Sequence, residues 1–333
     1  MAEAPVLVVG AGAWGTALAS VCARAGRPVL LYDKDAATLA ALRATRHHPR
    51  FAADLELHAA IEPVDDLAAA PPLAFAILVV PYQVMRAALG TLRAALPALP
   101  AVACASKGFE IETGMMAHEI VADVLGPELP FAQLSGPNFA VEIMYGSPAA
   151  ITVGASSAAL GAQLVNAMHG AAFRPYYTDD VIGVEIGGAL KNVIAIAAGI
   201  ADGLALGANT RAALITRGLA EIARFGIARG GRMETFMGLS GMGDLVLTCT
   251  DNQSRNRRFG MALAQSGSVS HAEATVGALV EGVATARAIA RLATRGQVDM
   301  PIAAEVARVL AGTTTPREAV RNLLGRDPTS EAR

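Results

Sequence analysis

Short apolar runs alternate with helical patterns over the first half of the chain. Val6–Val9 is apolar and ends at glycines, and helical spacing follows from Trp14 to Ala25. Val29–Tyr32 and the helical pattern Ala36–Arg46 repeat this order. Further apolar runs lie at Leu73–Val80, Val102–Ala105, Phe131–Leu134 and Ala149–Val153. Such alternation predicts an α/β domain whose mostly parallel sheet is covered by helices on both faces.

The pattern changes near Tyr176–Asp180. Beyond that point the sequence shows helical segments and loops without a convincing series of strands. Val181–Leu206 is apolar around nearly its whole circumference, which predicts a long helix in the middle of a helical domain. A chain of 333 residues is long enough for two domains. We therefore expect a sheet domain over residues 1–180 and an all-helical domain over residues 181–333.

Composition and charge narrow the class of protein. Hydrophobic residues make up 53% and charged residues 17%, so a large core is available and wholesale disorder is excluded. The formal charge of −2 argues against general binding of nucleic acid or anionic membranes. Glycines and prolines interrupt or dilute the longer uncharged stretches, so we expect no integral membrane segment.

Cysteines and histidines give no sign of a metal site. The three cysteines are odd in number and far apart, which fits a reducing, cytoplasmic setting better than a disulfide framework. His47-His48 has no spaced partners and is interpreted as loop. His118-Glu119 lacks the second histidine of a zinc-protease helix. We expect no metal.

A glycine-rich hexad follows the first apolar run. Gly10-Ala11-Gly12-Ala13-Trp14-Gly15 has the G-x-G-x-x-G spacing and opens a predicted helix. The first glycine permits a tight turn, the second lets a pyrophosphate approach the backbone, and the third lets the helix pack closely. Asp33 follows about 20 residues later, where a carboxylate would bind the ribose hydroxyls of NAD. The sequence therefore predicts a dinucleotide site of the Rossmann type.

The residues after the second apolar run bear on the choice of cofactor. The carboxylate of Asp33 would repel the 2′-phosphate of NADP, whereas Lys34 and the nearby Arg46 would attract it. Asp33 could equally be a solvated strand end. Both NAD and NADP remain open, with a slight lead for NAD.

Lysine is rare in this chain. Only Lys34, Lys107 and Lys191 occur, so nearly every other positive charge is an arginine. An ammonium can lose its proton near neutral pH when it is desolvated, and a guanidinium cannot. Lys107 follows a predicted parallel strand, and Lys191 lies in the long apolar helix beside Asn192. We favour functional roles for both over an exposed loop lysine and a snorkelling side chain.

Two polar segments interrupt the helical half. Gly238–Asp244 contains three glycines and ends in an acid, and Thr250–Arg258 is the most polar stretch of the chain. Serine, arginine and asparagine together can surround a phosphate, although a solvated loop or a helix cap would look the same. The basic cluster is short and lacks aromatic residues between its charges, which disfavours a nucleic-acid patch.

Taken together, these segments resemble a known family. The combination comprises Gly10–Thr16, Ser106-Lys107-Gly108, Ser135-Gly136-Pro137, Lys191-Asn192, Ser240–Asp244, Leu245–Gly260 and Val280-Glu281-Gly282. It is similar to glycerol-3-phosphate dehydrogenase of the bacterial NAD(P)-dependent type, from about residue 5 to about residue 325. The resemblance implies a Rossmann domain followed by a helical domain, often as a homodimer. It also implies interconversion of sn-glycerol 3-phosphate and dihydroxyacetone phosphate, a supply for phospholipid synthesis.

The resemblance also implies roles for individual residues. Lys191 corresponds to the general acid/base, and Lys107 and Asp244 complete the catalytic set. Substrate contacts correspond to Lys107, Gly136, Asn138, Lys191, Asp244, Ser254, Arg255 and Asn256. Positions at the cofactor are Gly10, Gly12, Ala13, Trp14, Gly15, Asp33, Lys34, Lys107, Ala140, Arg255, Leu279 and Glu281.

Some positions depart from the family pattern. Ala13 replaces a usual serine, Asn138 stands where serine or threonine is common, and Asp33 stands where small residues are common. Pro81-Tyr82-Gln83 differs from the frequent Pro-Ser pattern. Two alternatives stay open: a related two-domain reductase of another small phosphorylated or hydroxy-acid substrate, and a catalytically silent dinucleotide-binding regulator.

Overall fold

The computed structural model describes residues 3–327 and contains one sheet of eight strands. The strand order is β3-β2-β1-β4-β5-β6-β7-β8, and only the β6–β7 pair is antiparallel. The strands are β1 (Val6–Val9), β2 (Val29–Tyr32), β3 (Ile61–Val64), β4 (Phe75–Leu78), β5 (Val102–Cys104), β6 (Phe131–Ser135), β7 (Ala149–Ala155) and β8 (Phe173–Thr178). This mostly parallel sheet confirms the predicted fold class.

Helices cover both faces of the sheet, as the short apolar strands predict. Alternate residues of a strand point to opposite faces. In β1, Val6 and Val8 therefore pack with α1 (Ala13–Arg24) and α6 (Ala158–Met168), whereas Leu7 and Val9 pack with α3 (Met85–Ala95) and α4 (Ala117–Leu125). Strands β2 and β3 lie on one side of β1, and β4 to β8 lie on the other side. The order in which the chain adds strands to the sheet therefore switches direction between β1 and β4. Open parallel sheets bind their ligands at this switch point, beyond the carboxyl ends of the strands.

The other regular elements of the described residues are helices. In the sheet half, α2 (Ala36–Thr45) and α5 (Ala140–Met144) complete the covering layers. The second half contains α7 (Val181–Gly203), α8 (Gly207–Ile227), α9 (Met233–Met237), α10 (Asp244–Thr250), α11 (Arg255–Ser266), α12 (Val269–Val276), α13 (Glu281–Gly296), α14 (Pro301–Leu310) and α15 (Pro316–Leu324). The expected boundary at residues 180 and 181 stays a prediction, and residues 328–333 of the expected second domain lie outside the described residues.

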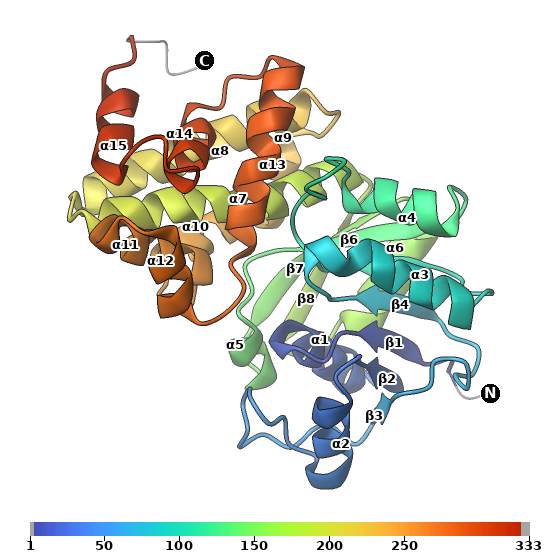
Figure 1. Ribbon diagram of the computed structural model, residues 1–333. Coiled ribbons are helices and arrows are strands. Elements are labelled where there is room, and N and C mark those ends of the chain that lie inside the picture. Colours follow the sequence, from blue (N-terminus) through green and yellow to red (C-terminus); the bar gives the residue numbers. More distant parts are fainter. Residues whose placement is uncertain (1–2, 328–333) are drawn as a thin grey trace.

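The long helix α7 runs from the sheet into the centre of the helical half (Figure 1). Helices α8, α10, α11, α13 and α14 all pack against it. By length and composition α7 could cross a membrane, but most of it is buried inside the protein. Burial on all sides explains its apolar circumference. At its start, Glu185 accepts a hydrogen bond from the Nδ1 atom of His118 on α4 at 2.5 Å.

The two edge strands differ from the predictions. Strands β3 and β8 were not predicted, because neither is a continuous apolar run. Each carries a proline, Pro63 or Pro175, and exposes part of its length. Proline cannot donate a ladder hydrogen bond and is tolerated at sheet edges. The helix predicted over Val181–Leu206 ends at Gly203, and the strand predicted over Leu73–Val80 is limited to Phe75–Leu78.

One loop of the sheet half is anchored in the helical half. The segment after β5 places Phe109 and Met116 in the core cluster formed by α7, α8 and α13. Phe109 is fully buried, and its ring meets the ring of Phe225 on α8 edge to face at 6.2 Å. The loop that carries Lys107 is thereby fixed to the helical half as well as to the sheet.

This anchor generates a prediction about stability. Truncation of Phe109 to alanine leaves a cavity in the helical core and should cost about 3–5 kcal/mol of the free energy of unfolding. Ile227→Ala, at an exposed end of α8, is the matched control and should change stability little. Urea titration of both variants measures the difference. Equal stabilities would contradict the anchor.

Candidate active site

Three charged side chains meet where the sheet joins α7. The carboxylate of Asp244 accepts a hydrogen bond from Lys107 Nζ at 2.6 Å on Oδ2 and one from Lys191 Nζ on Oδ1. Ser135 Oγ also donates to Oδ2, at 3.3 Å. Asp244 is 1% exposed and Lys191 is 8% exposed. We call Lys107, Lys191 and Asp244 the charged cluster.

Each member of the charged cluster comes from a different part of the fold. Lys107 follows β5 at the carboxyl edge of the sheet, Lys191 lies in the middle of α7, and Asp244 is the first residue of α10. A widened helical turn, Leu239–Gly243, precedes Asp244. Such turns are frequent at functional sites.

Close packing of glycines brings Asp244 to Lys191. A Cβ atom on Gly187 of α7 would lie 2.6 Å from the carbonyl oxygen of Ser240, so only glycine lets the widened turn lie directly on α7. Lys191 follows Gly187 by one helical turn and therefore lies on the same face of α7. Gly187, a glycine within the predicted long helix, thus lets the amine and the carboxylate come close together.

The electrostatics of the cluster favour proton exchange at Lys191. Burial lowers the pKa of the Lys191 ammonium to about 8; the charge of Asp244 opposes this shift and the charge of Lys107 adds to it. Burial alone would raise the pKa of Asp244, but the two ammonium groups hold it below its ordinary value. The structure therefore combines a carboxylate that is ionised at neutral pH with an amine that can titrate near neutral pH.

The start of α13 and the start of α11 lie next to the charged cluster. Burial raises the pKa of Glu281, against the charges of Arg255, Lys107 and Lys191. Arg255 is exposed at the first position of α11, and its guanidinium makes no hydrogen bond or ion pair with any residue between 3 and 327. Leu279, just before α13, is 55% exposed. An anionic ligand could therefore reach Arg255 from solvent.

The neighbours of Arg255 have structural contacts of their own. Ser254 caps α11, with its Oγ accepting the Arg257 N–H at 3.2 Å. Asn256 Nδ2 donates to Asn192 Oδ1 at 2.9 Å, and its Oδ1 accepts the Gly282 N–H at 2.9 Å. The Ser254 hydroxyl hydrogen and one Asn256 amide hydrogen remain available to a ligand.

A buried ion pair holds this segment on α7. Arg257 donates through Nε to Asp202 Oδ2 at 2.8 Å, and it also donates to Asn252 Oδ1. Both partners of the ion pair are about nine-tenths buried. Arg257 lies two residues beyond Arg255, so it points to the opposite side of α11. This contact anchors the helix whose first residue, Arg255, faces outward.

The loop after β6 contains Gly136 and Asn138. A Cβ atom on Gly136 would lie 3.1 Å from the carbonyl oxygen of Ala150, so the chain is tightly packed there. Asn138 Nδ2 donates to the same oxygen at 2.9 Å, while its buried Oδ1 meets no donor among residues 3–327. An orphaned acceptor of this kind suits a ligand hydroxyl or a water molecule.

The glycine loop between β1 and α1 fits a dinucleotide pyrophosphate. Cβ atoms on Gly10 and Gly15 would lie 2.3 Å from Val79 O and 1.7 Å from Gly10 O, which excludes larger residues. A Cβ atom on Gly12 would meet nothing within 4 Å, so open space lies in front of this backbone. Ala13 and Trp14 form the first turn of α1, whose N-terminus favours anions.

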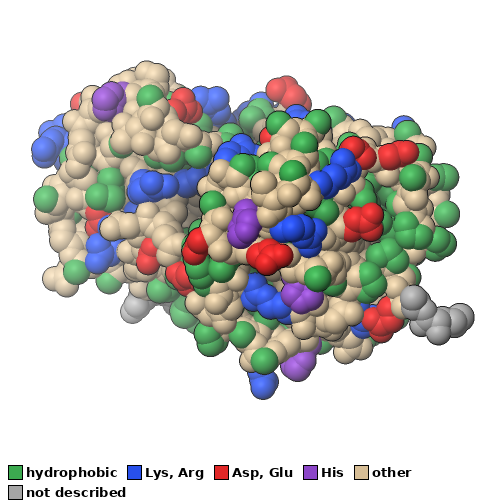
Figure 2. All heavy atoms as spheres, turned by 90° about the horizontal axis from the view of Figure 1, so that it is seen from below, with side chains coloured by type: hydrophobic (Ala, Val, Ile, Leu, Met, Phe, Trp, Pro, Cys, Tyr) green, Lys and Arg blue, Asp and Glu red, His purple; other side chains and the backbone are tan. Residues whose placement is uncertain are grey.

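The residues after β2 occupy the place expected for the adenosine end. Asp33 follows β2, and its carboxylate accepts the N–H of Ala11 at 2.6 Å and that of Asp35 at 2.9 Å. Lys34 is exposed. The Arg46 guanidinium donates to the carbonyl oxygens of Ile61, Leu57 and His58, so it is held against the backbone, and its attraction for a 2′-phosphate stays a prediction. Viewed from the α2 side, basic, acidic and histidine side chains are interspersed (Figure 2).

The predicted site residues thus form two groups. The charged cluster, Glu281 and Arg255 form one, and the glycine loop with Asp33 and Lys34 forms the other; Ala140 begins α5, on the segment that follows Asn138. Ser135 and Thr248 lie in segments that carry the family resemblance, but the sequence pattern predicted no role in the site for either. Thr248 donates to the Asp244 carbonyl at 2.6 Å, and only its position one turn after Asp244 could have signalled this.

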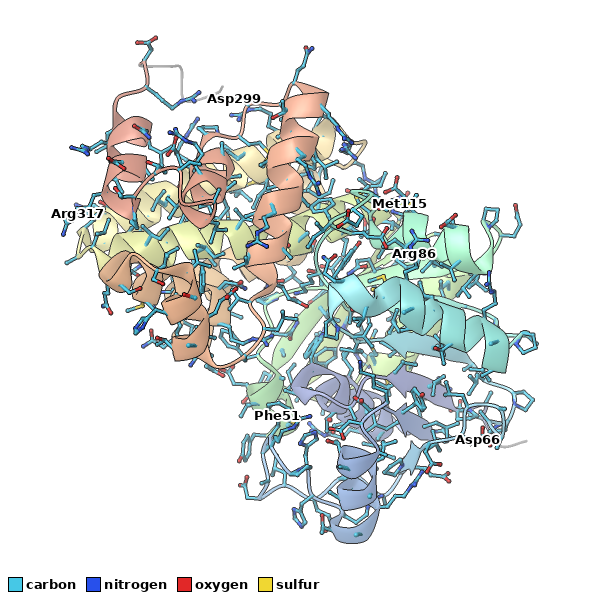
Figure 3. All side chains as sticks on the ribbon, in the orientation of Figure 1. Phe51, Asp66, Arg86, Met115, Asp299 and Arg317 are labelled. Carbon is cyan, nitrogen blue, oxygen red and sulfur yellow. The ribbon has the colours of Figure 1, made fainter. Side chains whose placement is uncertain are left out.

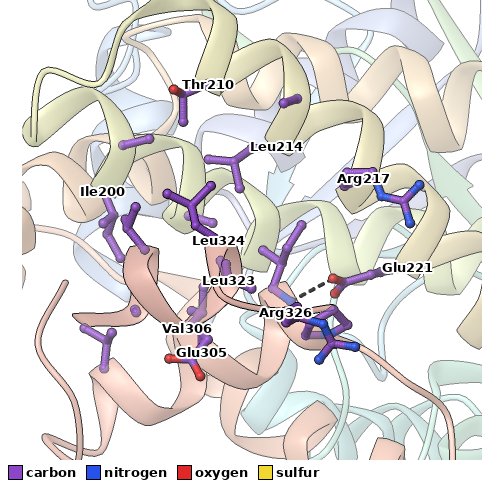
Figure 4. A pocket seen from close by; sticks show the side chains of 18 of the residues that line it. Ile200, Thr210, Leu214, Arg217, Glu221, Glu305, Val306, Leu323, Leu324 and Arg326 are labelled. Atoms are coloured by element: carbon purple, nitrogen blue, oxygen red, sulfur yellow. Dashed lines mark hydrogen bonds between the residues drawn. The ribbon is translucent and has the colours of Figure 1, made fainter. Parts of the chain in front are cut away.

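A separate cavity of about 660 Å³ opens in the helical half (Figure 4). Apolar side chains such as Ile200, Leu214 and Val306 line it, and Arg217, Glu221 and Arg326 lie toward one end. No member of the charged cluster lines this cavity. It is therefore distinct from the candidate active site.

Comparisons with known proteins agree over nearly the whole chain. Residues 5–160 match the family described as NAD-dependent glycerol-3-phosphate dehydrogenase N-terminus, and residues 180–321 match its C-terminus. The chain is 49% identical over 328 residues to glycerol-3-phosphate dehydrogenase (NAD(P)+) of Methylococcus capsulatus, covering 98% of each. It is 47% identical to the enzyme of that name from Nitrosococcus oceani, covering 98% of this chain and 95% of the relative.

A solved structure extends the similarity to three dimensions. The crystal structure of glycerol-3-phosphate dehydrogenase from Coxiella burnetii superimposes with a TM-score of 0.92 at 38% sequence identity. The match covers 97% of this chain and 99% of that chain. The Coxiella burnetii enzyme and the present chain therefore share both halves of the fold.

The buried carboxylate of Asp244 generates a prediction. Asp244→Asn leaves two ammonium groups without their counter-charge and should lower the free energy of unfolding by about 3–5 kcal/mol. Asp65→Asn removes an exposed carboxylate that pairs with Arg43 and should leave stability nearly unchanged. Thermal or urea unfolding of both variants at pH 7 provides the comparison. An Asp244→Asn protein as stable as the wild type would show that the cluster is not a structural unit.

Proposed function

The chain belongs to the family of NAD-dependent glycerol-3-phosphate dehydrogenases, and on this premise we propose that it interconverts sn-glycerol 3-phosphate and dihydroxyacetone phosphate with NAD or NADP. The single observation that carries the proposal is the charged cluster, which places a titratable lysine at the carboxyl edge of the sheet. The product of the reductive direction would serve phospholipid synthesis.

The cofactor supplies or accepts the hydride when it is bound. The backbone at Gly12 and the N-terminus of α1 would hold its pyrophosphate, and Asp33 and Lys34 would lie at its adenosine end. Gly10, whose N–H donates to the Tyr32 carbonyl at 2.7 Å, and Gly15 would shape the tight loop behind it. Further contacts would come from Ala13, Trp14, Lys107, Ala140, Arg255, Leu279 and Glu281. The open space in front of Gly12 and the tight contacts behind Gly10 and Gly15 support this assignment.

Lys191 moves the proton in this proposal. In the reductive direction its ammonium donates a proton to the ketone oxygen as that oxygen gains negative charge. In the oxidative direction the neutral amine removes the alcohol proton. Lys107 supplies a second positive charge that stabilises the oxygen, and Asp244 fixes both amines in place. The pKa of Lys191, near the working pH, supports the exchange in both directions.

The N-terminus of α11 holds the phosphate. Arg255 provides a charge-assisted hydrogen bond, and Ser254 and Asn256 add neutral donors. Gly136 and Asn138 would border the carbon skeleton. Fixing the phosphate places C2 of the substrate next to Lys191 and so converts binding energy into orientation. The exposed, unpaired guanidinium of Arg255 supports this role among the described residues.

The alternative functions are less favoured. A silent regulator would not need the intact charged cluster, and a reductase of another substrate would not need the Leu245–Gly260 segment that matches this family. A cytoplasmic location and a homodimer stay predictions. The free, buried state of Cys22, Cys104 and Cys249 supports the reducing compartment.

The first prediction concerns the pH dependence of the two directions. The value of kcat/KM for ketone reduction should fall as the pH rises through about 8, because the ammonium of Lys191 is lost. The value for alcohol oxidation should rise over the same range. Lys191→Arg keeps the charge but cannot release the proton, and it should lose at least about 100-fold in kcat. Stopped-flow or steady-state absorbance of NADH measures both.

Cofactor binding provides the control for Lys191→Arg. The dissociation constant of NADH should stay close to that of the wild type, which shows that the loss lies in proton transfer. A variant with wild-type kcat would contradict the assignment of Lys191. Failure of the wild type to turn over dihydroxyacetone phosphate would contradict the proposed reaction.

The second prediction concerns the phosphate. Arg255→Ala should raise KM for dihydroxyacetone phosphate roughly tenfold or more, because a charge-assisted hydrogen bond is lost. Arg317→Ala is the matched control, since Arg317 lies on α15, at the end of the helical half away from the sheet (Figure 3). Steady-state kinetics at saturating NADH separates KM from kcat. Equal KM values for the two variants would reject the phosphate role.

A further inference from the structure

We propose that His48, buried behind the glycine loop, is a positioning residue that orients the Gly12 N–H for the cofactor pyrophosphate, and that its protonation weakens cofactor binding. The inference goes beyond the proposed function by assigning a residue that touches neither substrate nor reacting atoms. It rests on dinucleotide binding at the glycine loop.

The hydrogen bonds of His48 determine which ring nitrogen carries the proton. Its Nδ1 accepts the backbone N–H groups of Arg50 at 3.1 Å and Phe51 at 3.2 Å. Nδ1 is therefore unprotonated, and Nε2 carries the hydrogen. That Nε2–H donates to the carbonyl oxygen of Ala11 at 2.8 Å. His48 is only 3% exposed, so these contacts are largely shielded from bulk solvent.

The contact with Ala11 orients the peptide group that faces the ligand. The Ala11 carbonyl and the Gly12 N–H belong to one planar trans peptide, so they point in opposite directions. Because the carbonyl points to His48, the Gly12 N–H points away from His48, and it donates no hydrogen bond to any residue between 3 and 327. A Cβ atom on Gly12 would meet nothing within 4 Å, so a ligand has room to approach this residue. The N–H of Ala11 itself is held by Asp33 Oδ2 at 2.6 Å. The two hydrogen bonds fix Ala11 from both sides.

The same imidazole shapes the turn beside the adenosine end. The rings of His48 and Phe51 lie 4.9 Å apart, and the guanidinium of Arg50 lies 5.6 Å from the Phe51 ring centroid. Arg50 also approaches Asp35 at 3.7 Å, two residues beyond Asp33. His48 therefore ties the pyrophosphate loop to the residues that border the ribose position.

Protonation would break this arrangement. A proton on Nδ1 would face the N–H groups of Arg50 and Phe51 and replace two attractions by repulsion. Burial lowers the pKa of His48, and the charge of Arg50 lowers it further. The hydrogen bond to Ala11 and the charges of Asp33 and Asp35 act in the opposite direction. Other titratable or charged side chains around the adjoining cavity of about 360 Å³ are Arg24, Glu56, His58 and Tyr145. The weakening of cofactor binding should therefore appear below neutral pH.

Three variants separate the two contacts of the imidazole. Gln can place an amide nitrogen at the position of Nε2, so His48→Gln keeps the donor to Ala11 and loses the acceptor for the turn. Asn offers an acceptor near Nδ1 but does not reach Ala11, and His48→Ala loses both. The dissociation constant of NADH, measured by fluorescence, should rise about tenfold in His48→Asn and His48→Ala and about threefold or less in His48→Gln.

Steady-state kinetics and the pH dependence of NADH binding distinguish a positioning role of His48 from a merely structural one. At saturating NADH, the kcat of each His48 variant and its KM for dihydroxyacetone phosphate should stay within about twofold of the wild-type values. The wild-type dissociation constant should rise between pH 7.5 and 5.5, and that of His48→Gln should not follow it. His169→Gln, at an exposed position after α6, controls for loss of a histidine.

The outcomes distinguish the inference from the proposed function. Wild-type NADH affinity in folded His48→Ala, or a wild-type pH dependence in His48→Gln, would overturn the positioning role while leaving the reaction intact. If His48→Ala does not fold, weak NADH binding by His48→Asn with tight binding by His48→Gln still supports the role, and the reverse order overturns it. A wild-type protein that binds no NADH would overturn both.

Discussion

The ion cluster around Asp244 is the constraint on which the rest of the structure depends. One carboxylate that is 1% exposed forms ion pairs with two ammonium groups from different halves of the fold. Burying these charges is costly unless all three are present and in contact. The same burial lowers the pKa of Lys191. Folding and proton transfer therefore depend on the same contact. The charged cluster is complete only when the sheet half and the helical half are packed together.

Backbone packing maintains this contact. Gly187 lets the widened turn before Asp244 lie on α7, and Phe109 anchors the Lys107 loop among the helices. The Lys107 loop is therefore held by the sheet and by the helical half. The glycine loop lies within the sheet half, where Asp33 and His48 hold Ala11. Cofactor position and proton-transfer geometry are thus set by different parts of the fold.

The sequence predicts the parts of this structure that depend on local pattern and residue type. Buried strands, the glycine loop and the rare lysines all stand out, and the structure brings Lys107 and Lys191 together on Asp244. Edge strands β3 and β8 did not stand out, because their prolines and exposed residues resemble loop. The contacts of Arg46 and His48 could not be predicted either. Both residues bind backbone carbonyl groups brought close only by the tertiary fold.

Direct titration of the lysine amines tests the central claim most directly. The chain contains three lysines, so ¹³C or ¹⁵N labelling of lysine gives three side-chain signals, and Lys191→Arg identifies the one from Lys191. The account predicts that this signal titrates at about 8 in the wild-type protein. A Lys191 signal that titrates at the ordinary value of 10.5 would contradict the role of the buried cluster in proton transfer.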